Sequence, residues 1–147
     1  MILSRTLMIA SVAIAASGMT LTAASAETIT YRANLTASAE TPPTQSSGTG
    51  TLSATFDTVT KKLSWTVTYS GLTGPATMAH FHGPAKEGVA GPVMVPIKGD
   101  LASPINGEAE LTADQAKALQ DGEMYFNIHT AANKPGEIRG QVVPASK

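Results

Sequence analysis

The stretch Gly50–Asp57, GTLSATFD, alternates small or polar residues with apolar ones, and Leu63–Tyr69, LSWTVTY, repeats the alternation shortly afterwards. Successive side chains of a β-strand point to opposite faces of the sheet, so a period of two is typical of a strand with one buried face. Residues 58–62 between the two stretches, which are polar except for Val59, are typical of a hairpin connection. The two stretches therefore predict a pair of antiparallel strands.

Period-two alternation continues on both sides of this hairpin. The prolines of Glu40–Gly48 predict a loop there, because proline has no N–H to donate to a neighbouring strand. Turn signals recur about every 8 to 12 residues, as in β-sandwiches and β-barrels. We therefore predict an all-β fold, an antiparallel immunoglobulin-like or Greek-key β-sandwich. Its further strands are expected at Thr28–Leu35, Thr77–His82, Pro92–Ile97, Asn106–Leu111, Glu123–His129 and Glu137–Val143.

One short helix is expected within this strand-rich chain. Thr112 can cap Ala113–Gln120, and Gln115 stands three residues later, where a capping box needs a Glu or Gln. Gly122 suits the left-handed residue that commonly ends a helix. The predicted fold is thus all-β with a single short helix.

The N-terminus is typical of a secretory signal peptide. Met1–Ala26 carries the basic residue Arg5 near its start, continues through an apolar run and ends on Ala24–Ala26, a small-residue cleavage site. The apolar run is shorter than the roughly 20 residues that a spanning helix needs. We expect cleavage before Glu27, a single domain over residues 27–147, and a periplasmic or secreted product. No cysteine follows the apolar run, so we expect no lipid or membrane anchor after cleavage.

The charge of this mature domain limits the classes of partner that it can bind, and its cysteine content limits how it can be stabilised. Removal of Arg5 leaves nine basic residues against eleven acidic ones, a net charge near −2, and neither sign clusters. A nucleic-acid-binding surface needs a basic patch, so no nucleic-acid partner is expected. The chain has no cysteine, so packing must stabilise it without disulfides, and metal binding could supplement the packing.

All three histidines of the chain fall in two short blocks. His80 and His82 are two apart on a predicted strand, so their imidazoles share one face, and His129 lies near the end of a later strand. Neutral imidazoles suit copper or zinc, and three such ligands leave one coordination position open. The ordinary alternative is that each histidine is a polar residue satisfied by internal hydrogen bonds.

Glu137 and Arg139 share a face of the last predicted strand by the same rule. A hairpin loop at residues 131–135 would place His129 opposite Glu137, whose carboxylate could orient the ring or complete a metal's coordination shell. The alternative is a Glu137–Arg139 ion pair that fixes the strand.

The order of these motifs resembles the CHRD domain family, named from chordin. The resemblance rests on the Pro-Pro loop, the capped helix, and the segments Ala79–Ala85 (AHFHGPA), Tyr125–Thr130 (YFNIHT) and Gly136–Gln141 (GEIRGQ), and it spans Thr28 to Val143. It implies an extracytoplasmic, immunoglobulin-like β-sandwich and no established reaction. Chordin's role in binding growth factors is not implied, because this chain lacks its cysteine-rich modules.

A weaker likeness is to copper-zinc superoxide dismutase, which also carries His-x-His on a strand of an exported sandwich. Three histidines are too few for its two-metal site, and no disulfide can form here. The sequence therefore favours an exported binding module, rather than an enzyme, that takes a copper or zinc ion at His80, His82 and His129, with Glu137 in support. The alternatives are a copper redox enzyme of the dismutase type and a purely structural or adhesive protein.

Overall fold

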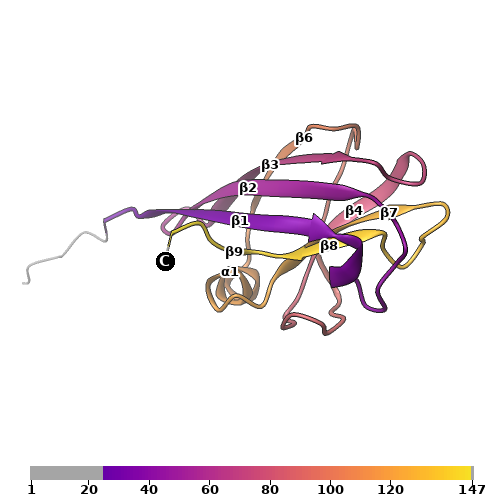
Figure 1. Cartoon of the computed structure of the whole chain (residues 1–147). Coiled ribbons are helices and arrows are strands. Elements are labelled where there is room, and N and C mark those ends of the chain that lie inside the picture. The colour runs from indigo at the N-terminus through magenta and orange to yellow at the C-terminus, as the bar shows by residue number, and fades with distance from the viewer. Residues whose placement is uncertain (1–24, 147) are drawn as a thin grey trace, which may run out of the picture.

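The computed structural model describes residues 25–146 and is shown in Figure 1. The predicted leader, Met1–Ala26, lies outside this range except for its last two residues, so its cleavage stays a prediction. Within residues 25–146, no helix is long and apolar enough to cross a membrane.

The elements confirm the all-β class with one short α-helix. The predicted strand Glu137–Val143 is divided in two: Ile138–Gln141 pairs with the strand Tyr125–Thr130, whereas Val143–Pro144 pairs with the strand Thr28–Thr36. In chain order the elements are β1 (Thr28–Thr36), the 3-10 turn η1 (Ala37–Ala39), β2 (Thr49–Asp57), β3 (Lys62–Ser70), β4 (Ala76–His82), β5 (Val93–Pro96), β6 (Ile105–Glu110), α1 (Ala113–Gln120), β7 (Tyr125–Thr130), β8 (Ile138–Gln141) and β9 (Val143–Pro144).

The strands form one antiparallel sheet in the order β5-β4-β7-β8-β1-β2-β3-β6, with β9 also paired to β1 (Figure 1). The predicted hairpin is β2–β3, whose facing pairs include Leu52 with Val67 and Ala54 with Trp65. The sheet curls so that its halves meet across the core, where Trp65 of β3 contacts Phe81 of β4 edge to face (centroids 5.1 Å apart). Each strand in this order is hydrogen-bonded to the next, so one continuous sheet extends from β5 to β6.

Helix α1 is capped as its sequence predicts. The Thr112 hydroxyl accepts from the Gln115 N–H (3.2 Å), and the Gln115 side chain accepts from the Thr112 N–H (2.9 Å). Gly122 follows with a φ of 74°. The Gln115 amide also donates to the Met94 carbonyl of β5 (2.7 Å), so the same residue ties the helix to the sheet.

Strands β4, β7 and β8 direct apolar side chains to the core and polar side chains to the outside. On β4, Ala79 and Phe81 are fully buried in the core, so His80 and His82 lie on the outer face. By the same alternation, this outer face also receives Asn127 and His129 of β7 and Arg139 of β8. Loops cover this polar face, so the structure has a second buried layer, made of polar groups.

Candidate metal centre

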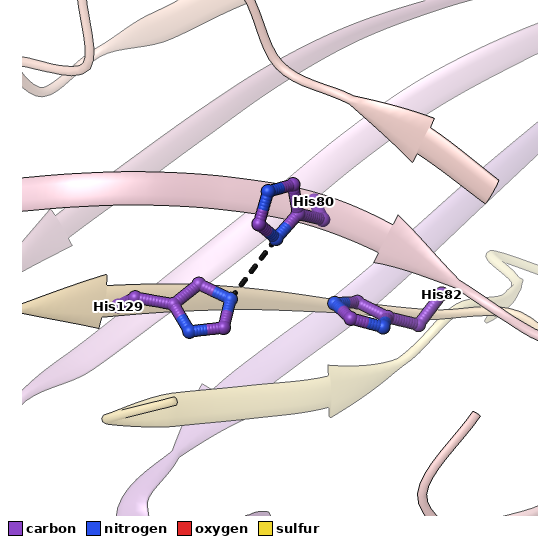
Figure 2. A group of neighbouring side chains, drawn as sticks. All are labelled: His80, His82 and His129. Atoms are coloured by element: carbon purple, nitrogen blue, oxygen red, sulfur yellow. Dashed lines mark hydrogen bonds between the residues drawn. The ribbon is translucent and has the colours of Figure 1, made fainter. Parts of the chain in front are cut away.

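Figure 2 shows the three histidines converging on the outer face of β4 and β7. One ligand atom from each of His80, His82 and His129 lies within 4.8 Å of the other two. His80 pairs with Asn127 across the strands and Met78 with His129, which places His129 diagonally opposite His80. The convergence that a metal site at these three histidines requires is therefore present.

Backbone carbonyls fix the orientation of two of the rings. His82 Nδ1 lies 2.9 Å from the Gly91 carbonyl and His129 Nδ1 lies 2.8 Å from the Lys134 carbonyl. A carbonyl only accepts, so each Nδ1 carries the proton and each Nε2 presents a lone pair. Such hydrogen bonds orient metal-ligating histidines in proteins.

The third ring joins the other two through a hydrogen bond. His80 Nδ1 lies 3.0 Å from His129 Nε2 (Figure 2). Since His129 Nε2 has no proton in this tautomer, His80 Nδ1–H is the donor. His82 Nε2 is buried and has no hydrogen-bond partner among the described residues. The Nε2 lone pair of His82 thus lies beside two further imidazoles and accepts no hydrogen bond from the described residues. Together the three rings offer nitrogen ligands of the kind that a transition-metal ion binds.

The surroundings hold the rings in the neutral form. Burial and the nearby rings of His129 and His82 lower the pKa of His80 to about 4. The pKa values of His82 and His129 are lowered as well, chiefly by burial. The carbonyl partners of the two rings, and the Asn127 amide beside His82, oppose this effect without reversing it. The neutral imidazole is the form that binds a metal.

The spacing of the nitrogen atoms is near that of a metal site. Two nitrogens that share a tetrahedral zinc at ~2.0–2.1 Å lie ~3.4 Å apart. The 3.0 Å between His80 Nδ1 and His129 Nε2 is close to this value, and the three ligand atoms all lie within 4.8 Å of one another. To ligate a metal through Nδ1, His80 would carry its proton on Nε2 instead, because a protonated ring nitrogen has no lone pair to give. The three histidines could therefore hold a metal ion.

The expectation that Glu137 orients His129 is wrong. Its carboxylate accepts hydrogen bonds from the Ser46 hydroxyl (2.6 Å), the Thr73 N–H (2.7 Å) and the Thr73 hydroxyl (2.6 Å), and also from Thr130 and Asn133. Glu137 precedes β8 and follows Gly136, whose φ of 140° breaks the regular strand. This break explains why the pairing rule gave the wrong contact.

The Glu137–Arg139 ion pair is absent among the described residues as well. Arg139 is 1% exposed, and its guanidinium carbon lies 3.4 Å from the centre of the Tyr125 ring. Its N–H groups donate to the Thr41 hydroxyl (3.3 Å) and the Lys86 carbonyl (3.2 Å). Arg139 thus supports the polar layer through an aromatic ring and neutral acceptors.

Sequence reasoning missed Tyr125 and Asn127 at this site. The Tyr125 ring stacks on His82 (4.9 Å between centroids, 4° between planes), and Asn127 is 2% exposed between Tyr125 and His129. The period-two rule that placed His80 with His82 also places these residues on the face of His129. The carbonyls of Gly91 and Lys134 have no side-chain signature.

Fold and site together define an all-β domain with a three-histidine cluster on the outer face of its sheet. The family model described as CHRD domain matches residues 31–142, a range that includes all three histidines. The chain therefore belongs to the CHRD domain family, as the sequence resemblance predicted. Comparison with curated proteins and with solved structures gave no match.

Proposed function

We propose that this CHRD domain binds a copper or zinc ion through His80, His82 and His129. The observation that supports the proposal is the convergence of three ligand atoms within 4.8 Å. Two of the rings are held by carbonyls that keep their Nε2 lone pairs free of protons. Internal hydrogen bonding alone does not account for His82, since its Nε2 is buried without a donor among residues 25–146.

The site fits a binding module that holds its metal at the surface of the sheet. Three neutral nitrogen donors suit copper and zinc and leave a fourth position. His82 and His129 are buried, whereas His80 is half-buried, so solvent reaches the cluster beside His80. We further propose that the protein acts in the periplasm or the medium, on the basis of the predicted leader; intact mass of the exported protein, beginning at Glu27, tests this.

Titration with Cu(II) and Zn(II) by calorimetry tests the proposal. His82→Asn is the sharpest variant, because its amide can still donate to the Gly91 carbonyl but lacks the reach of Nε2. We expect His82→Asn to weaken binding by at least the ~10- to 100-fold that follows loss of a ligand's supporting hydrogen bond. The double variant His80→Ala/His82→Ala should bind no ion specifically while its circular dichroism stays that of a β protein. Equal titration of wild type and double variant would refute the proposal.

Copper redox chemistry of the dismutase type is a second candidate function, supported by the solvent access beside His80. A copper ion open to solvent can exchange electrons with a small oxidant or reductant. Superoxide consumption by the copper-loaded protein, compared with the double variant under the same copper load, tests it. Equal rates for the two proteins would refute the redox function and leave metal binding as the only proposed function.

A further inference from the structure

Asn127 occupies the part of β7 that lies between the histidines. It is two residues before His129 on the same face, and its cross-strand partner on β4 is His80. Directly opposed residues of antiparallel strands have Cβ atoms about 5 Å apart. The amide lies near enough to His82 to act on that ring as a hydrogen-bonding group. Asn127 is therefore adjacent to all three imidazoles.

The orientation of the Asn127 amide is fixed from behind. Its Nδ2 donates to Glu40 Oε1 (3.3 Å), and both residues are buried. Gly136 closes over this contact with a φ of 140°, and a Cβ there would lie 2.7 Å from Asn127 Nδ2. With Nδ2 turned to Glu40, the amide oxygen Oδ1 faces away from that carboxylate, toward the histidine side.

Oδ1 is buried and has no hydrogen-bond partner among the described residues, and the same is true of His82 Nε2. A buried acceptor without a donor destabilises the folded state, so a pair of them in one place calls for a shared partner. Neither can satisfy the other, because the ring proton of neutral His82 is on Nδ1 and is donated to the Gly91 carbonyl. A cation between them would satisfy both lone pairs.

We propose that Asn127 Oδ1 is the fourth protein ligand of the metal ion bound by His80, His82 and His129. This inference rests on the proposed metal-binding function and extends it to a neutral N₃O donor set. Nitrogen and oxygen donors suit Zn(II) and Cu(II), whereas thioether sulfur suits Cu(I). The exposed Met78, two residues before His80 on the same face, is the competing sulfur donor.

Cobalt(II), bound in place of zinc, reports the donor set through its visible absorption bands. We expect Asn127→Ala to lower Zn(II) affinity by about 10-fold or more, on the scale of other losses at metal sites, and to change the cobalt bands. Asn127→Asp keeps an oxygen donor and adds a negative charge, so it should retain binding and shift the bands. The matched control Met78→Leu, on the same face, should change neither affinity nor spectrum.

The outcomes separate this inference from the function on which it rests. If wild type binds none of copper, zinc and cobalt, the metal function itself fails. If wild type binds through the histidines and both Asn127 variants keep its affinity and spectrum, only the fourth-ligand assignment is overturned. If Met78→Leu changes the affinity and the spectrum and the Asn127 variants do not, the fourth ligand is the Met78 sulfur and the assignment to Asn127 is overturned. Should Asn127→Ala fail to fold, the cobalt spectrum of Asn127→Asp decides alone.

Discussion

Glu137 and Arg139 are two residues apart in the sequence, yet each stabilises a different part of the molecule. Glu137 is fully buried and joins residues 44–46, Thr73 and the end of β7 through its carboxylate and its carbonyl. Arg139 holds Thr41, Lys86 and the Tyr125 ring on the outer face. Each residue therefore needs its own test.

We predict that Glu137→Gln destabilises the fold most at neutral pH. Burial alone would raise the pKa of Glu137, but hydrogen bonds from Ser46, Thr130 and Thr73 outweigh it and lower the pKa to about 2. Because this value lies below the ordinary 4.5, the carboxylate contributes its stability above pH 4.5 and loses it as the pH falls toward 2. A shift of this size corresponds to about 3 kcal/mol.

Urea unfolding of wild type and Glu137→Gln between pH 2 and pH 7 measures this contribution. The difference in unfolding free energy between the two should be about 3 kcal/mol at pH 7 and should shrink steadily below pH 4.5. A difference that stays constant with pH would show that the charge of Glu137 is not what the hydrogen bonds stabilise.

A double-mutant cycle of Glu137→Gln and Arg139→Ala should show independent effects. Each single substitution should destabilise, Arg139→Ala because it leaves the buried Tyr125 face and the Thr41 and Lys86 acceptors without a partner. Since the two side chains share no partner, their effects should add to within about 0.5 kcal/mol. A coupling energy well above that value in denaturant melts would mean that the two side chains interact, as an ion pair would.

At the scale of elements, β6 approaches β3 closely because one of its residues has no side chain. Gly107 is paired with Trp65, and a Cβ at Gly107 would lie 2.5 Å from Trp65 Cζ2 and 2.7 Å from Cε2. Trp65 in turn packs on Phe81 across the core. The contact therefore links the edge strand β6 to the strand that carries His80 and His82.

We predict that Gly107→Ala destabilises the protein by about 1–3 kcal/mol, the usual cost of overpacking a well-filled site. Gly74→Ala is the matched control, because no atom of the described part of the chain lies within 4 Å of a Cβ built there. Thermal melts of the two variants measure the difference. Equal melting temperatures would mean that Trp65 moves aside without cost.

At the scale of the whole molecule, a metal ion at the cluster would bind only the folded chain. His82 and His129 come from strands β4 and β7, and the intervening chain includes β5, β6 and α1. A ligand that binds only the native state at 100 times its Kd stabilises that state by about 2.7 kcal/mol.

We therefore predict that saturating Zn(II) raises the melting temperature of wild type by about 5–10 °C. His80→Ala/His82→Ala should show no such shift. Scanning calorimetry with and without zinc, with a chelator control, measures both. The same shift in both proteins would place the ion elsewhere.

The sequence by itself determined the local features of this protein. Alternation along Gly50–Asp57 and Leu63–Tyr69 predicted the β2–β3 hairpin, and Thr112 with Gln115 predicted the capped helix. These signals are readable because strand faces and helix caps depend on residues a few positions apart. The shared face of His80 and His82 belongs to the same group.

Only the tertiary structure decided which strands are neighbours and where the loops place their carbonyls. Pairing of β4 with β7 brings His129 to His80, and Gly91 and Lys134 then orient the rings through backbone atoms that any residue carries. The break at Gly136 turned Glu137 away from His129, although the register alone placed them opposite each other. Strand neighbours and loop conformations depend on contacts between distant residues, which leave no periodic pattern in the sequence.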